Sequence, residues 1–308
     1  MIKGTYIFYE DGKEVYRSKN VITKFGKRFI TNFIAGNVSN NRKDMAIGID
    51  SAAATENDTR LGFEFYRLPV SIGSTDIQTV DGVSTYSVIY KATIPQDIAG
   101  EINEVGIYPS GRSSINNYDS KFISDFNNNL DWQTSSGYNP LTMTSNSKIG
   151  DTLLKMSSNG TSAQEYTATI NPMDLSGYSV NDTVTLAYYK YDTNLTSIKV
   201  RLYSSDTAYY ETTITPASGT GYKITSDIPL STAFGSPTGS PDKSNINKIG
   251  IIVTPTSSAS DVGLDGLRIN DEDTFDPSYG IISRSVITAL TKLAGRQIDI
   301  EYRMDLTF

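Results

Sequence analysis

Short runs of alternating apolar and polar residues cover most of the chain, and this pattern predicts antiparallel β-strands. Residues 5–9 and 14–17 are rich in strand-forming residues and flank Asp11-Gly12, a dipeptide suited to a tight turn with positive φ. They predict a β-hairpin. The same alternation predicts long strands over 61–72 and 85–94, and a strand over 101–109 that ends at Pro109.

Two further segments have a regular period. From Ile298 to Phe308 every second residue is apolar, which predicts a strand with one buried face and one solvated face. After Asn20 the apolar residues recur at helical spacing, so we expect Asn20 to cap a helix that Gly36 ends. The apolar residues of this helix are Val21, Ile22, Phe25, Phe29, Ile30, Phe33 and Ile34.

The composition changes between about 119 and 272, where Ser, Thr and Asn are frequent and many short strands alternate with turns. This is typical of a β-sandwich. The segment that follows is too short for a core of its own, yet its last strand needs a buried face. We therefore predict a mainly β protein. A small α+β body, residues 1–118 plus 275–308, has antiparallel strands and one N-terminal helix, and it carries an inserted β-sandwich or jelly-roll domain over 119–274.

Several classes of chemistry are excluded by composition. The 308 residues include no histidine and no cysteine, so Ser-His-Asp and Cys-His systems, imidazole zinc sites and disulfides are ruled out. The formal net charge of −7 argues against nucleic-acid binding. Residues 119–272 hold 16 acidic and 10 basic side chains, so −6 of that charge belongs to the predicted insert. No apolar run is long enough for a membrane span. Residues 1–5 lead directly into a polar-apolar alternation and not into an apolar run, so we expect a protein made without secretory export.

A cluster of tyrosines marks the predicted sandwich. If Tyr188 faces inward with Val184 and Leu186, then Tyr189 and Tyr191 share the outer face of a strand. Such rings can stack on sugars, contact another protein, or belong to an ordinary strand, and all three interpretations are open. The sugar-binding hypothesis names Trp132, Tyr189, Tyr191 and Tyr203.

Two aspartates lie near the ends of the insert, Asp125 at its opening and Asp265 at its close. The first and last strands of a sandwich often lie side by side, which would let both carboxylates share a hard cation with carbonyl oxygens. The alternative is that each aspartate caps a turn.

Four motifs in the body follow one another in a fixed order. They are Asn20-Val21-Ile22-Thr23 with the helix after it, Met45-Ala46-Ile47-Gly48, the segment 56–67, and Ile102-Asn103-Glu104-Val105-Gly106-Ile107-Tyr108. Together they resemble virion structural proteins of tailed bacteriophages, of the fibre, collar or baseplate type. The resemblance covers the body and implies no catalytic residues.

The insert has a different resemblance, carried by Asp125-Phe126 with Trp132, by Leu175-Ser176-Gly177-Tyr178, by 195–202 and by 261–269. These segments are similar to jelly-roll modules of the carbohydrate-binding type. The resemblance implies a calcium ion near Asp265. The sequence departs from the pattern at Gly266, where a second acidic residue is common.

These features predict a non-enzymatic structural component of a tailed phage particle (tail, neck or collar, baseplate or head fibre) that displays a jelly-roll accessory domain. Its partners would be other virion proteins and further copies of itself, without nucleic acid or membrane insertion, and its location the virion after lysis. No cofactor is expected, and a structural calcium ion is the one candidate for a bound ion. The predicted assembly interface consists of Phe25, Phe29, Phe33, Tyr302 and Phe308.

Two alternatives to this reading are open. The first is a protein that binds cell-surface glycans for receptor recognition or adhesion. The second is a polysaccharide depolymerase, because a glycosidase needs only two carboxylates and no sequence motif.

Overall fold

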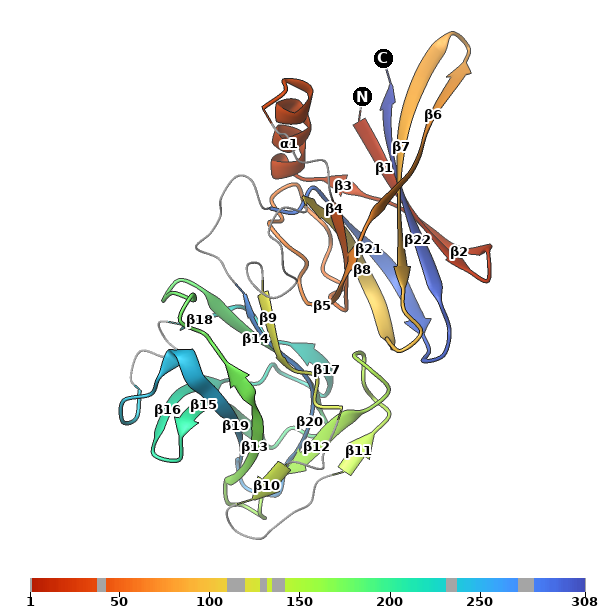
Figure 1. The fold of residues 1–308 in the computed structure, drawn as a ribbon. Helices are drawn as coiled ribbons and strands as arrows, with labels where there is room; N and C mark the ends of the chain where they lie inside the picture. The colour runs from red at the N-terminus through yellow and green to blue at the C-terminus, as the bar shows by residue number, and fades with distance from the viewer. Residues whose placement is uncertain are drawn as a thin grey trace. The chain divides into compact units, whose positions relative to one another are not determined.

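The chain divides into two compact units, the body (Met1–Asn117 with Thr274–Phe308) and the sandwich unit (Tyr118–Asp273). The computed structural model describes residues 2–37, 43–109, 120–127, 132–134, 142–230, 237–270 and 280–307. Antiparallel strands dominate both units, and the only α-helix among the described residues belongs to the body (Figure 1). The predicted fold class is therefore confirmed. In the described part of the chain, no helix has the length and apolarity to cross a membrane.

The described residues of the body form two five-stranded sheets. The first body sheet has the order β2 (Lys13–Lys19), β1 (Ile2–Glu10), β22 (Ile298–Thr307), β7 (Val83–Ile94) and β6 (Ser71–Val80). The second body sheet has the order β3 (Val21–Ile22), β21 (Ser283–Lys292), β8 (Gly100–Pro109), β4 (Lys43–Gly48) and β5 (Glu64–Pro69). Strands β22 and β21 follow the sandwich unit in the sequence. They thus lie at the centre of the first body sheet and beside β8 in the second.

The core of the body combines residues of both sheets with the helix. In β22 the alternation buries Ile298, Ile300 and Tyr302, each at most 2% exposed. Phe25 and Phe29 of helix α1 (Lys24–Ile34) pack in the same cluster. Because the hydrophobic effect favours apolar residues at these buried alternate positions, the sequence pattern predicted the strand.

Helix α1 begins later than predicted. Thr23, and not Asn20, is its N-cap, and the Thr23 hydroxyl accepts a 2.9 Å hydrogen bond from the Gly26 N–H. The reason is that Val21 and Ile22 form strand β3 and pair with β21, so their backbone groups are engaged in a sheet. Gly36 follows the helix with a φ of +76°, as expected of a residue that ends a helix.

The predicted strand over 61–72 is wrong as a single element. The structure has β5 up to Pro69 and then β6 from Ser71, and these two strands belong to different body sheets. Pro69 lacks a backbone N–H and so ends the ladder of β5. Apolar and polar residues keep alternating where the chain passes from β5 in one sheet to β6 in the other. For this reason the sequence pattern did not reveal the change of sheet.

The part of the sandwich unit that the structure describes has two facing sheets around one core. The β15 sheet has the order β10 (Trp132–Thr134), β13 (Gln164–Met173), β19 (Ile246–Pro255), β15 (Leu195–Ser205) and β16 (Ala208–Ile214). The β14 sheet has the order β11 (Thr142–Thr144), β12 (Leu153–Ser157), β20 (Asp261–Asn270), β14 (Thr183–Lys190) and β17 (Gly221–Ile224). Its further pairs are β9 (Ser120–Ser124) with β20 and β18 (Ile228–Pro229) with β14.

Candidate functional site

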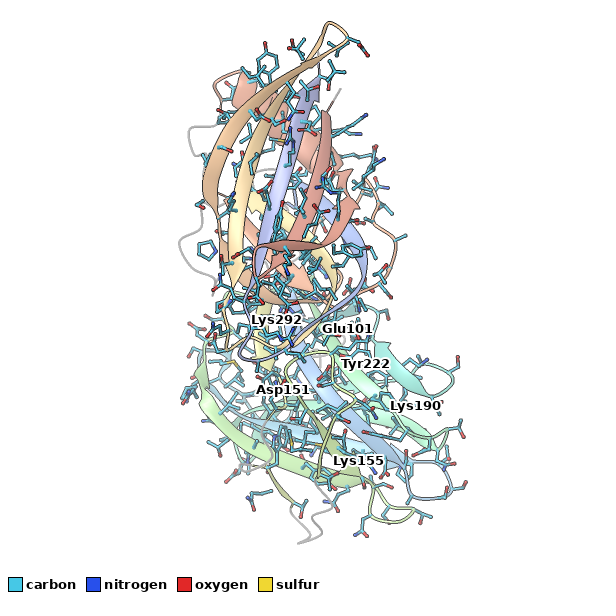
Figure 2. The ribbon with its side chains drawn as sticks, turned by 90° about the vertical axis from the view of Figure 1, so that its right-hand side faces the viewer. Glu101, Asp151, Lys155, Lys190, Tyr222 and Lys292 are labelled. Carbon is cyan, nitrogen blue, oxygen red and sulfur yellow. The ribbon has the colours of Figure 1, made fainter. Side chains whose placement is uncertain are left out.

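A group of tyrosines lies on the outer face of the β14 sheet. Tyr188 is 1% exposed and belongs to the core, so its neighbour Tyr189 faces outward. The ring centres of Tyr189 and Tyr191 are 4.7 Å apart, and the planes are inclined by 53°. Tyr222 of β17 lies directly across from Tyr189 in the strand register, and all three rings are partly exposed. Figure 2 labels Tyr222, Lys155 and Lys190 on this unit.

Polar side chains fix the orientation of the Tyr191 ring. Its hydroxyl shares a 2.8 Å hydrogen bond with the hydroxyl of Thr144. The Lys155 ammonium lies 5.0 Å from the centre of the ring and forms a 2.7 Å ion pair with Asp261. Because each group has a partner on another strand, the cation, the carboxylate and the ring are held in place before any ligand binds.

Tyr222 is held by Asp265. Its hydroxyl donates a short hydrogen bond to Asp265 Oδ2, which also accepts from the backbone N–H groups of Lys148 and Ile149 at 2.8 and 3.1 Å. Burial raises the pKa of Asp265 to about 7, because these donors only partly replace the lost hydration. The Lys148 ammonium lies 5.2 Å from the centre of the Tyr222 ring.

The oxygens near Asp265 fit a hard cation. Asp265 Oδ1 and Asn127 Oδ1 are both buried and have no hydrogen-bond partner among the described residues. Strand β9 pairs with β20, and the Asp125 carboxylate that follows β9 is close enough to raise the pKa of Asp265. Uncharged and anionic oxygens of this kind are the ligands that calcium prefers. Within the described ranges no group of three or more His, Cys, Asp or Glu residues could hold a metal ion.

Asp125 also has the role of a turn residue. Its Oδ1 accepts a 3.2 Å hydrogen bond from the Asn127 N–H, around Phe126 with a φ of +53°. Gly150 has a φ of +71°, and a Cβ there would lie 2.4 Å from Asn127 Oδ1. The glycine therefore lets the backbone of the 148–150 segment pack closely against the Asn127 amide.

Tyr203 lies on the other sheet, so it cannot form one site with Tyr189 and Tyr191. It lies on the outer face of the β15 sheet, where its ring packs over Gly250 and its hydroxyl donates a 2.5 Å hydrogen bond to Glu165. Burial, followed by this bond, raises the pKa of Tyr203 to about 12. Only 4% of the residue is exposed, because polar neighbours cover it. The prediction that this ring stacks on a sugar is therefore wrong.

Trp132 is also too deeply buried to be one of the predicted sugar-binding residues. It is 4% exposed, and its ring packs 5.6 Å from Phe126 inside the sandwich core. Its position opposite Ala168 on β13 places the side chain on the inner face of the β15 sheet. The largest apolar ring of the unit thus contributes to folding and is not available to a ligand.

The predicted assembly residues of the body have unequal positions. Phe25 is 6% exposed and packs in the core, so the prediction that it forms an interface is wrong. Phe29, Phe33 and Tyr302 line an apolar groove of about 250 Å³ between α1 and the first body sheet. Phe33 is 43% exposed, whereas Tyr302 is only 1% exposed. Phe308 lies outside the described residues.

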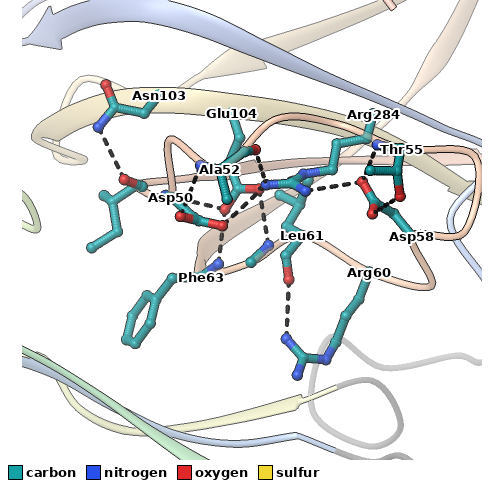
Figure 3. A network of polar contacts seen from close by, with 12 residues as sticks. Asp50, Ala52, Thr55, Asp58, Arg60, Leu61, Phe63, Asn103, Glu104 and Arg284 are labelled. Atoms are coloured by element: carbon teal, nitrogen blue, oxygen red, sulfur yellow. Dashed lines mark hydrogen bonds and ion pairs between the residues drawn. The ribbon is translucent and has the colours of Figure 1, made fainter. Parts of the chain in front are cut away.

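A buried ionic cluster in the body was not found from the sequence (Figure 3). Glu104 has no exposed surface and accepts hydrogen bonds from the N–H groups of Phe63 and Gly62 at 2.8 and 2.9 Å. Burial raises the pKa of Glu104, and the charge of Arg284 opposes that shift. Glu104 was noticed only as part of a motif. A charged residue between Ile102 and Val105 in a buried strand is the signal that could have indicated its role.

Three comparisons with known proteins give limited similarity. No protein-family model matches the chain, and no curated protein sequence matches it. A family 11 carbohydrate-binding module from Clostridium thermocellum, in complex with a β-1,3-1,4-mixed-linked tetrasaccharide, is 16% identical with a TM-score of 0.36, covering 51% of this chain and 98% of that chain. A family 28 carbohydrate-binding module specific for non-crystalline cellulose is 16% identical with a TM-score of 0.31, covering 46% and 87%. An agarase is 13% identical with a TM-score of 0.37, covering 52% and 26%.

Proposed function

We propose that the sandwich unit binds a glycan without cleaving it, through the outer face of the β14 sheet. The observation that carries the proposal is the Tyr189–Tyr191 pair, two partly exposed rings whose centres lie 4.7 Å apart at the end of β14. The C–H faces of a sugar ring pack well on such aromatic surfaces, which lose little conformational freedom on binding.

The charged groups beside these rings supply hydrogen bonds to sugar hydroxyls. The Lys155 ammonium is a donor and Asp261 an acceptor, and both stay partly exposed, with 28% and 32% of their side chains accessible. Hydrogen bonds to ionised groups are about twice as strong as those between neutral groups. The face therefore combines stacking with polar contacts, as a sugar site requires.

The same contacts favour binding over hydrolysis. Asp261 is paired with Lys155, and Asp265 Oδ2 accepts three hydrogen bonds. Neither carboxylate is thus placed as the free acid or base that a glycosidase needs.

Binding should be measured with the full chain by isothermal titration calorimetry against soluble polysaccharides. The mixed-linked β-1,3-1,4-glucan of the family 11 module is the first probe, followed by solubilised cellulose and agarose fragments. We expect Tyr189→Ala and Tyr191→Ala each to weaken binding about tenfold or more. Tyr209→Ala, on the outer face of the β15 sheet, is the matched control and should leave binding unchanged.

Two results would overturn the proposal. One is the absence of binding to every glycan of the panel, and the other is equal affinity of the Tyr189→Ala variant and the natural chain. Release of reducing ends during incubation would instead support the depolymerase alternative. That the body assembles into a phage particle stays a prediction, which mass spectrometry of purified particles would test.

A further inference from the structure

The apolar groove of the body has one charged side chain among its described lining residues, Lys43. Lys43 is 6% exposed, and its ammonium lies 4.6 Å from the centre of the Phe29 ring. The other lining residues are almost all apolar, and they come from α1, β7, β22 and neighbouring strands: Phe29, Ile30, Phe33, Ile34, Ile72, Thr75, Val88, Tyr90, Ile107, Ile282, Tyr302, Met304 and Leu306. Such a groove suits an apolar group that carries a negative charge.

The body also exposes an apolar turn with a negative charge. Strands β6 and β7 are joined by Asp81-Gly82, with φ of +50° and +78°, in the tight two-residue turn expected of this dipeptide. Val80 and Val83 face each other across the turn and are 66% and 47% exposed. Ile77, three residues before Val80 and on the opposite face of the hairpin, is 63% exposed. Exposed valines on both sides of an aspartate are costly to leave in water.

This turn cannot fill the groove of its own chain. Strands β6 and β7 are paired all the way to Val80 and Val83, so the hairpin cannot fold back. Thr75 lines the groove, and a strand rises about 3.3 Å per residue, which places Val80 about 17 Å farther along β6. Figure 1 shows the β6–β7 hairpin extending away from the rest of the first body sheet.

We propose that the Val80–Val83 turn of one copy inserts into the apolar groove of a second copy, with Asp81 directed toward Lys43. The two valines contact the apolar lining, and the carboxylate meets the one cation of the described groove wall. Each copy has one turn and one groove on different surfaces, so the contact is heterologous and can repeat into a ring or a filament. Repetition would place several sandwich units in one assembly, which increases avidity for a repeating ligand.

A second hairpin in the same sheet provides an internal comparison. Strands β1 and β2 are also joined by an Asp-Gly turn, Asp11-Gly12, but this turn is flanked by Glu10 and Lys13. The two hairpins thus share turn geometry and differ in whether valines or charged residues lie beside it. Only the valine-flanked turn matches the apolar groove.

The test is sedimentation equilibrium of the full chain without sugar. The natural chain should self-associate, and a turn variant, Val80→Ser with Val83→Ser, should associate at least tenfold more weakly. A groove variant, Thr75→Glu, should do the same, because the exposed Thr75 side chain is replaced by a larger one that occupies the groove and repels the Asp81 carboxylate. The control, Glu10→Ser with Lys13→Ser in the other hairpin, should associate as the natural chain does. Circular dichroism confirms that each variant is folded.

Mixing the two variants tests the geometry. The turn variant keeps an intact groove and the groove variant keeps an intact turn, so an equimolar mixture should form a one-to-one dimer while each variant alone is monomeric. A second turn variant, Asp81→Asn, keeps the turn and removes the charge, and should weaken association. Four results would overturn the proposal, and the first three are a monomeric natural chain, unchanged association of the turn variant, and no pairing in the mixture. Unchanged association of the groove variant, as pairing between β6 edges would give, also overturns it.

Discussion

Arg284 Nε donates a 2.9 Å hydrogen bond to the carboxylate of Glu104 in the interior of the body, where Glu104 has no exposed surface. The same guanidinium reaches Asp58 at 2.9 Å and Asp50 at 3.2 Å. Through these contacts it ties the segment between β4 and β5 to β8 and β21. One cation is therefore shared among three carboxylates, two from the segment between β4 and β5 and one from β8.

We expect Arg284→Met to lower the free energy of unfolding of the body by about 3 kcal/mol or more, because it leaves a buried carboxylate without its cation. Trp132 is the only tryptophan and belongs to the sandwich unit, so its fluorescence reports that unit while circular dichroism reports both. The urea transition seen by circular dichroism should shift to lower concentration, with the fluorescence transition unchanged.

The control is Arg17→Met. Arg17 forms an ion pair with Glu14 in which 53% and 41% of the side chains are exposed, and solvent screens such pairs. This variant should unfold as the natural chain does. If Arg284→Met also left the transition unchanged, the buried cluster would not stabilise the body.

The sequence predicted those elements whose signal is local. The hairpin at Asp11-Gly12 and the alternating strand from Ile298 depend on neighbouring residues only, and both are found. The start of α1 and the crossing near Val70 depend on which distant strand offers backbone partners. For Val21 that partner is Arg284 in β21, which no local pattern contains.

The candidate site shows the same limit. Alternation around Tyr188 correctly placed Tyr189 on an outer face, because a strand has only two faces. It could not say that Tyr203 belongs to the opposite sheet or that Trp132 packs in the core, since these depend on strand order. The Glu104 cluster needs three segments that only the fold brings together.

Lys43 should make the stability of the body depend on pH. Burial lowers its pKa from 10.5 to about 8, so between these values the unfolded chain binds more protons than the folded one. The contribution of Lys43 is then fully present above pH 10.5 and is lost as the pH falls through 8. The natural chain should thus gain stability relative to Lys43→Met as the pH rises from 8 toward 10.

Urea unfolding of both proteins at several pH values measures this difference, and subtraction removes the titration of the tyrosines that the two share. Lys24→Met, on an exposed position of α1, is the matched control and should show no such trend. A constant difference between the natural chain and Lys43→Met over this range would contradict the prediction.

The hydroxyl of Tyr203 should stabilise the sandwich unit. It donates a 2.5 Å hydrogen bond to Glu165, whose carboxylate also forms a 3.0 Å ion pair with Arg201. We expect Tyr203→Phe to destabilise this unit by about 1–2 kcal/mol, because a buried hydrogen bond to a charged acceptor is lost. Tyr209→Phe is the control, since the Tyr209 ring is only 4.9 Å away but its hydroxyl bonds no described residue. Equal Trp132 fluorescence transitions for the two variants would refute the assignment.

Calcium should stabilise the sandwich unit through Asp265, Asn127 and Asp125. Asp265 Oδ1 and Asn127 Oδ1 are buried without hydrogen-bond partners among the described residues, so a bound cation would supply the missing interaction. At a calcium concentration about 100 times the dissociation constant, binding to the folded state adds ~2.7 kcal/mol. We expect millimolar calcium to raise the melting temperature followed by Trp132 fluorescence, and chelation to reverse the rise. Asp265→Asn should abolish the response, whereas Asp206→Asn, at a position whose side chain is 92% exposed, should retain it. Identical melting of the natural chain with calcium and with chelator would show that these oxygens hold no cation.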